Sequence, residues 1–257
     1  ISSPVPKKKI SYSISIIDKL DSLVGFFLIN EKPTSSKDPF ALRRAAIGIL
    51  RIIIENNLTI KLRDIINYAI KLYEDQGIKI ANPHTENEIL DFFKERMRNI
   101  LKEKKIKNDI IEASISSHIG DNYMDLFKKS LLLNKNINKE MVVNIISSYK
   151  RASKIIENTE KRITGKPDAV LFRQSEEEAL FDKINEIRKD FTVKEDQKNY
   201  EKLLFQMSEI KPFTDNFFDN VKVNDENNDI KNNRLELLKM FCNTFDNFVN
   251  FSKLEGL

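Results

Sequence analysis

The chain has 257 residues, a formal net charge of +4 and a pI near 8.9, so it is mildly basic and compatible with nucleic-acid binding without requiring it. Its single cysteine, Cys242, excludes an internal disulfide framework and a cysteine-based zinc site, and it suits a reducing, cytoplasmic setting. No apolar run approaches the ~18 residues of a membrane span, so no membrane association is predicted. Because only 6 glycines and 7 prolines interrupt the chain, long helices are favoured over many short strands.

The first half of the chain predicts a series of helices, each with one apolar face. Asp38 can cap a helix whose first position is Pro39, and Asn56 with Asn57 ends that helix. Gly77 is a typical C-terminal stop for the next one. Two shorter helical segments, "NDIIEASISS" and "DNYMDLFKKSLLL", come later. The inward faces at helical spacing are Leu42, Ala46, Ile49 and Ile53; Leu62, Ile66, Ala69 and Tyr73; and Ile89, Phe93, Met97 with Ile100 or Leu101.

The second half continues in the same way. A long helix is expected from about Lys139 to Lys161, and the segment "GKPDAVLF" breaks the pattern after it. Ser175 caps the following helix, whose first turn is acidic, and Pro212 marks a later stop or kink. A last helix is expected from about Ile230 to Lys253. The inward faces of the long and the last helix are Val142, Ile145, Tyr149, Ala152 and Ile156; and Leu235, Leu238, Phe241, Phe245 and Phe248. Since no alternating strand pattern appears, the predicted fold is all-α, a helical bundle.

Five segments carry a family resemblance and extend over nearly the whole chain. In chain order they are "DKLDSLVGFF", "KPTSSKDPFALRRAAIGILRIIIE", "SSYKRASKII", "DAVLFRQSEEEALF" and "FFDNVKVNDENNDIKNNRLELL". In these segments the sequence resembles the C-terminal part of the beta subunit of bacterial heterotetrameric glycyl-tRNA synthetases, and "KPTSSKDPFALRRAA" is close to a family signature. The last segment also resembles the helical anticodon-binding domain shared with arginyl-tRNA synthetases.

The resemblance implies three parts in the chain. Residues 1–32 look like the end of an HD-type helical domain, residues 33–135 like a helical connector, and residues 136–257 like a DALR-type anticodon-binding helical bundle. A chain that begins with Ile is expected to be a fragment or a processed product. The N-terminal part would then lack its normal partners, so its apolar face should dock on the rest of the chain or pair with another copy. That face is Ile14, Ile17, Leu20 and Val24.

The same resemblance implies a role in attaching glycine to tRNA(Gly) during translation. The chain would bind tRNA(Gly), while the alpha subunit of an alpha2beta2 enzyme would activate glycine with ATP and magnesium. No Gly-rich phosphate loop, Ser-His-Asp set or adenylation motif occurs, so no catalytic residue and no cofactor is assigned to this chain, and it is expected to be inactive alone. The alternative is an all-helical protein-interaction scaffold with no RNA role.

Asp18, in "IIDKLDSLV", resembles the distal aspartate that helps to hold a metal in metal-dependent HD domains. Its histidine partners are absent, because His84 and His118 are isolated in other parts of the sequence. One carboxylate cannot form a site that needs several ligands, so no metal site is expected. This argues against a third hypothesis, a phosphohydrolase derived from the HD domain.

Three arginines, Arg43, Arg44 and Arg51, lie on the helix expected after Pro39. Arg44 and Arg51 are seven residues apart and therefore share a face. The guanidinium fork suits either an RNA phosphate or a carboxylate on a neighbouring domain. Because this helix is so apolar, pairing with a neighbouring domain is favoured.

Two further groups are candidates for tRNA binding. In "YKRASKIIENTEKR", Lys150, Arg151, Lys154 and Lys161 recur on the polar side of a predicted helix, where cations would attract a polyanion by releasing its counterions. The alternative is a solvated polar face in a lysine-rich chain. In "KNNRLELL", Asn232, Asn233 and Arg234 combine amides and a guanidinium that can pair with the edges of unstacked bases. Phe217, Phe218 and Tyr200 are possible stacking partners, and the alternative for the whole group is helix capping and packing.

Overall fold

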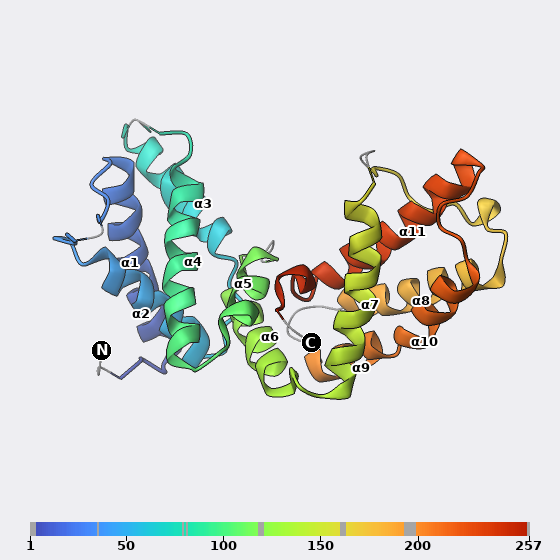
Figure 1. The fold of residues 1–257 in the computed structure, drawn as a ribbon. Helices are drawn as coiled ribbons and strands as arrows, with labels where there is room; N and C mark the ends of the chain where they lie inside the picture. The colour runs from blue at the N-terminus through green and yellow to red at the C-terminus, as the bar shows by residue number, and fades with distance from the viewer. Residues whose placement is uncertain are drawn as a thin grey trace. The chain divides into compact units, whose positions relative to one another are not determined.

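The computed structural model describes residues 4–34, 36–78, 80, 82–117, 121–159, 163–192 and 199–255. Within these ranges the regular elements are α-helices and short 3-10 turns, without a strand, which confirms the all-α prediction (Figure 1). One isolated bridge pairs Lys61 with Asn122. None of the described helices is long and apolar enough to cross a membrane.

The chain folds as two compact units, which we describe separately. The first unit takes residues 1–106 and 118–128, and the second takes residues 107–117 and 129–257. The chain therefore changes unit three times, after residues 106, 117 and 128, and the last change lies inside α6 (Tyr123–Asn136). The three family-derived parts, with boundaries at residues 32 and 135, remain a prediction about domain ancestry.

The first unit is built on four helices, α1 (Lys9–Leu28), α2 (Leu42–Glu55), α3 (Leu62–Asp75) and α4 (Thr85–Glu103). α1 packs on α2 and α3, and α4 packs on α2 and α3 from another side (Figure 1). The predicted inward face of α4 is confirmed, since Ile89, Phe93, Met97, Ile100 and Leu101 are all buried. Gly77 has a φ of 86°, the left-handed backbone expected at its stop position.

The N-terminal helix α1 docks on the rest of the first unit, which is one of the two outcomes predicted for it. Leu20 and Val24 are buried against α2 and α3, and the Tyr73 hydroxyl donates a hydrogen bond to the Asp21 carbonyl at 3.2 Å. The predicted face is only half correct, because Ile14 and Ile17 are 61% and 65% exposed. The buried stripe is instead Ile16, Leu20, Leu23, Val24, Phe27 and Leu28.

Asp38 caps α2, although the helix begins three residues later than predicted. The Asp38 carboxylate accepts hydrogen bonds from the backbone N–H groups of Leu42 at 2.8 Å and Arg43 at 3.1 Å. Pro39 and Phe40 form a turn, and Ala41 has a left-handed φ of 56° before the first helical residue. Phe40 stacks on Phe26 with ring centroids 3.8 Å apart. The carboxylate thus fixes the start and direction of α2 from outside the helix.

Replacing Asp38 by Ala should lower the free energy of unfolding by ~1 kcal/mol, because two N–H groups in the first turn of α2 lose their acceptor. Urea denaturation followed by circular dichroism measures this loss. Ser36→Ala is the matched control, since Ser36 is exposed in the same loop. Equal midpoints for the two variants would show that the cap contributes nothing.

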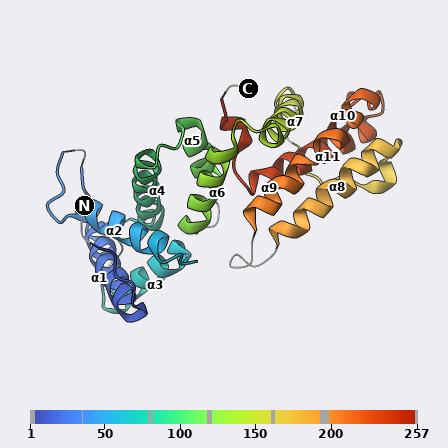
Figure 2. The ribbon, with the colours of Figure 1, turned by 90° about the horizontal axis from the view of Figure 1, so that it is seen from below.

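The second unit contains α5 (Asn108–Ser116), the second half of α6, α7 (Glu140–Glu157), α8 (Ser175–Phe191), α9 (Tyr200–Ser208), α10 (Lys211–Asn220) and α11 (Asn228–Asp246), with 3-10 turns at Ala169–Leu171 and Phe251–Lys253. α7 packs on α9, α10 and α11, and α8 packs on α9, α10 and α11. Figure 2 shows α8 beside α11. Aromatic rings fill the core, where Phe241 meets Phe245 with centroids 4.5 Å apart. Cys242 is buried there, which raises the pKa of its thiol.

Several predicted boundaries in this unit shift by a few residues. α7 ends at Glu157 rather than at Lys161, which lies outside the described residues. α8 begins at Ser175, and Gln174 takes the capping position instead. Pro212 lies in the first turn of α10 rather than ending a helix, as its fixed φ allows. α11 ends at Asp246, short of the predicted Lys253, and Phe248 is buried beyond it.

Candidate nucleic-acid interface

One face of α7 is basic, and the opposite face is part of the core. Val142, Ile145, Tyr149 and Ala152 are buried, as predicted, and α7 packs with them on its neighbours. Ile156, the fifth residue of the predicted face, is only half-buried. We call Lys150, Arg151 and Lys154 the α7 basic face. Lys154 and Arg151 are exposed and Lys150 is half-buried, so all three ammonium or guanidinium groups lie on the polar side of the helix. Lys161, the fourth predicted member, lies outside the described residues.

Arg151 also contacts α10. Its guanidinium lies 4.3 Å from the centroid of the Phe218 ring, and its Nη2 lies 3.7 Å from an Asp219 carboxylate oxygen. Both members of this ion pair are largely exposed, at 49% and 69%, and such pairs contribute little to stability. A phosphate can therefore compete with Asp219 for this guanidinium. Phe218, a predicted base-stacking residue, has Arg151 over its ring in this structure.

Asn233 holds a loop in place. It is 2% exposed, its side-chain oxygen accepts a hydrogen bond from the Asp168 N–H at 2.7 Å, and its amide nitrogen donates to the Asp168 carbonyl at 3.0 Å. This two-point pairing ties the turn after the "GKP" segment to α11. Both hydrogen-bonding groups of the Asn233 amide are thereby engaged inside the second unit.

Arg234 is the centre of a buried ion network. It is 4% exposed, its Nε donates to Glu177 at 2.9 Å, and its Nη1 donates to Asp225 at 2.8 Å and to the Lys222 carbonyl at 2.9 Å. Burial alone lowers the pKa of this guanidinium, but hydrogen bonds and charge pairing with Glu177 and Asp225 hold it above its ordinary value. Glu177 is fully buried and also accepts from the N–H groups of Arg173 and Gln174, so it joins α8 to α11.

The geometry does not support the predicted base contacts of Asn233 and Arg234. α11 begins at Asn228, so these residues lie in its second turn instead of at its exposed end, and their donors serve the fold. Asn232 is exposed and remains a predicted contact. Among the predicted stacking residues, Phe217 is fully buried, which indicates packing.

The three arginines of α2 have different environments. The Arg43 guanidinium donates to the Thr34 carbonyl in the loop before the helix, and Arg51 pairs with Glu55 one turn later at 3.1 Å. These partners lie in the first unit, and interdomain pairing stays a prediction for Arg43 and Arg51. Arg44 is exposed, and an interdomain role for it stays a prediction.

The candidate metal residues stand apart from one another. Asp18 is exposed on α1, His84 is exposed before α4, and His118 lies outside the described residues. In the part of the chain that the structure describes, no group of three or more His, Cys, Asp or Glu side chains could hold a metal ion.

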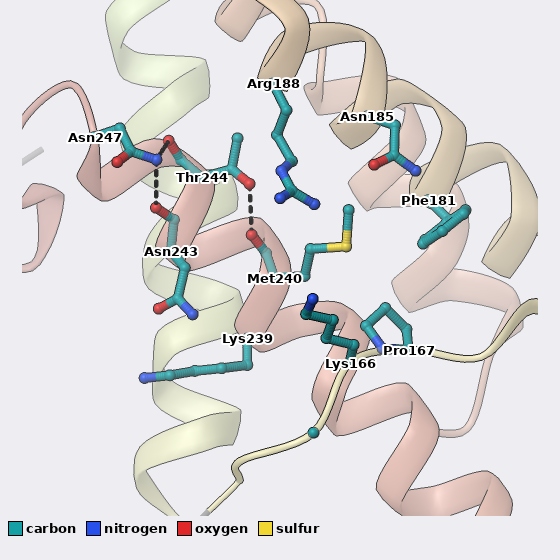
Figure 3. A pocket seen from close by; sticks show the side chains of 11 residues that line it. Lys166, Pro167, Phe181, Asn185, Arg188, Lys239, Met240, Asn243, Thr244 and Asn247 are labelled. Carbon is teal, nitrogen blue, oxygen red and sulfur yellow. Dashed lines mark hydrogen bonds between the residues drawn. The ribbon is translucent and has the colours of Figure 1, made fainter. Parts of the chain in front are cut away.

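A cavity of about 300 Å³ opens in the second unit between the loop at residues 165–167, α8 and α11 (Figure 3). Sequence reasoning missed it because its three cations, Lys166, Arg188 and Lys239, come from separate segments. In Figure 3 the Lys166 and Arg188 side chains approach the same space beside Met240, whereas Lys239 extends to another side of α11. The break at "GKPDAVLF" was the one sequence signal that bears on this loop.

Comparison with known proteins gives matches to both halves of the chain. Residues 1–116 match the family described as glycyl-tRNA synthetase beta subunit, and residues 145–254 match the DALR anticodon binding domain. The chain is 39% identical over 241 residues to a glycine–tRNA ligase beta subunit of Rickettsia africae, which covers 94% of this chain and 34% of that protein. It is also 34% identical over 257 residues to the glycine–tRNA ligase beta subunit of Clostridioides difficile, and this match covers 97% of the chain and 36% of that protein. The chain thus spans about a third of the length of these curated relatives.

Proposed function

Because the chain belongs to the glycyl-tRNA synthetase beta subunit family, we propose that it binds tRNA(Gly) as a part of such a beta subunit. The observation that carries this proposal is the match of residues 145–254 to an anticodon binding domain. Those residues include the α7 basic face and most of the second unit. The role would be to hold tRNA(Gly) in position while glycine is attached to it.

The chemistry of glycine activation belongs, in this proposal, to another polypeptide. The alpha subunit of an alpha2beta2 enzyme would use ATP and magnesium to form the activated amino acid, in the cytoplasm where translation takes place. The described residues of this chain contribute tRNA binding alone, and the isolated chain would support neither glycine-dependent ATP–pyrophosphate exchange nor charging of tRNA.

The α7 basic face supplies the general attraction for RNA. Ammonium and guanidinium groups on a helix surface neutralise phosphates and release the counterions condensed on the RNA, whatever the base sequence. Lys150 and Lys154 are one turn apart, so they can follow a phosphate backbone along the helix. Within the described residues, Asp219 is the carboxylate that pairs with this face, and it does so through Arg151.

A salt titration of the purified chain with tRNA(Gly) tests the proposal. Contact with about three phosphates predicts that the logarithm of the association constant falls with the logarithm of salt with a slope of roughly −2 to −3. Filter binding or fluorescence anisotropy measures it, with a tRNA of altered anticodon bases for comparison. Absence of binding at low salt would contradict the proposal and favour the helical scaffold without an RNA role.

A further inference from the structure

The cavity between α8, α11 and the loop at residues 165–167 combines three kinds of surface in one small space. Two cations approach it, Lys166 from the loop and Arg188 from α8, and both are exposed. Phe181 and Met240 supply apolar surface, and Asn185 supplies an amide. A volume of about 300 Å³ lies at the lower end of ligand pockets, which suits one small ligand rather than an extended one.

Two of the three cations at this cavity, Lys166 and Arg188, take no part in holding the described fold together. Among the residues that the structure describes, neither Lys166 nor Arg188 makes an ion pair or a side-chain hydrogen bond. This contrasts with Arg234 in the same unit, whose guanidinium is fully engaged. Lys239 differs from both, because it lies close enough to Asp246 to oppose the rise in pKa that burial causes in that carboxyl. Lys166 and Arg188 are therefore available to an anion.

The apolar side can accept a flat ring. Phe181 is half-buried and packs edge-on against Phe172 with centroids 5.5 Å apart, so its position is fixed. Met240 is also half-buried, and its flexible thioether adapts well to aromatic surfaces. Stacking of a base on such surfaces does not depend on which base it is.

The Asn185 amide adds a donor and an acceptor to this side of the cavity. Within the described residues its side chain has no hydrogen-bond partner, and Figure 3 shows it beside Phe181 on α8. An uncommitted amide can pair with the edge of a base once that base is out of a stack. By contrast, the Thr244 hydroxyl already donates to the Met240 carbonyl at 2.7 Å, and the Asn247 amide donates to the Asn243 and Thr244 carbonyls.

We propose that this cavity binds one unstacked nucleotide of a single-stranded RNA segment, with its phosphate at Lys166 and Arg188 and its base against Phe181 and Met240. The proposal rests on the tRNA-binding function and gives it a specific site. A paired base in a duplex could not enter, because its faces and edge are already occupied. The cavity would thus select loops over helices, which the α7 basic face cannot do.

Binding of nucleoside monophosphates, followed through the Met240 methyl group, tests the proposal. The chain has five methionines, so a sample labelled with 13C at the methionine methyl groups gives few signals, and Met240→Leu identifies the relevant one. Cytidine, guanosine, adenosine and uridine 5′-monophosphates are each titrated to millimolar concentration. At least one should shift the Met240 signal with saturation and leave Met207, which is fully buried on α9, unchanged.

Variants and simpler probes separate the parts of the site. Lys166→Ala and Arg188→Ala should each weaken the mononucleotide about tenfold, while Lys189→Ala, an exposed neighbour on α8, should not. The free nucleoside and inorganic phosphate should each bind more weakly than the joined molecule. An equal response to inorganic phosphate alone, or a stronger response to an oligoglutamate peptide, would overturn the proposal in favour of a plain anion site or a protein partner.

The cavity proposal and the proposed tRNA-binding function can each be wrong while the other holds. If tRNA(Gly) binds with the expected salt dependence but no mononucleotide shifts Met240, the cavity is not the site and the function stands. If mononucleotides bind at Met240 but tRNA(Gly) does not bind the chain, the cavity stands and the tRNA-binding function is wrong.

Discussion

Arg234→Ala is expected to lower the free energy of unfolding of the second unit by about 3–5 kcal/mol. The change leaves the Glu177 carboxylate, which is fully buried, without the cation that balances it, and it removes the donor to Asp225 and to the Lys222 carbonyl. Burying an unpaired charge costs far more than the pair contributes, which is why the effect should be large. Urea denaturation followed by circular dichroism measures it.

Two controls make the result specific to the buried network. Arg173→Ala removes an arginine of the same unit whose side chain is exposed, and it should change stability by no more than ~0.5 kcal/mol. The double variant Arg234→Met with Glu177→Gln removes both charges and should be more stable than Arg234→Met alone, since no unpaired charge remains. If Arg234→Ala unfolds at the same urea concentration as Arg173→Ala, the network does not hold α8 to α11.

A further variant, Arg234→Lys, decides whether Arg234 has a second role in RNA binding. Arg234→Lys keeps the positive charge but loses the planar fork that spans Glu177 and Asp225. If this variant remains folded and keeps its affinity for tRNA(Gly), the residue serves the fold alone. We expect this outcome because Arg234 is buried and its donors are already engaged inside the protein.

The helices could be predicted because their signals are local. The apolar positions of α4 and α7 recur at helical spacing within about twenty residues, and the structure buries the predicted ones except Ile156, which is half-buried. Asp38 binds the first N–H groups of α2, but the predicted N-cap position was wrong. Ala41 takes that position with a left-handed backbone that no sequence pattern signalled. The end of α11 was overestimated because Phe248 continues the apolar pattern after the helix has ended.

The candidate site was harder to predict because it depends on contacts between distant segments. Arg234 and Glu177 are 57 positions apart, and nothing in "KNNRLELL" reveals that its arginine faces a buried carboxylate. In a sequence, polar residues near the start of a helix are equally compatible with base contacts and with packing inside the protein. Only the tertiary structure distinguishes these two roles. The cavity cations Lys166 and Arg188 gather from a loop and a helix, so no spacing in the sequence unites them. The α7 basic face, in contrast, lies on one helix and was found from its period.

Replacing Lys150, Arg151 and Lys154 together by Ala should remove most of the sequence-independent attraction for tRNA. Loss of three phosphate contacts should flatten the salt slope by roughly 2–3 units, so that raising salt fourfold costs the variant roughly 20–40-fold less affinity than it costs the unchanged chain. The affinity for tRNA(Gly) and for an anticodon-altered tRNA should fall by similar factors, because ammonium groups do not distinguish bases. Anisotropy titrations at several salt concentrations measure both quantities.

A matched variant tests whether tRNA binding depends on where these three cations lie or only on the net charge of the chain. Lys71, Lys102 and Lys104 are exposed in the first unit, and replacing them by Ala lowers the net charge by the same three units, from +4 to +1. If the attraction came from net charge alone, the two triple variants would behave alike. If it comes from the α7 basic face, only the α7 variant changes the slope. An α7 variant with unchanged slope and affinity would show that this face is solvated surface in a lysine-rich chain, and that phosphate contacts must be sought elsewhere, with Lys166 and Arg188 as the next cations to replace.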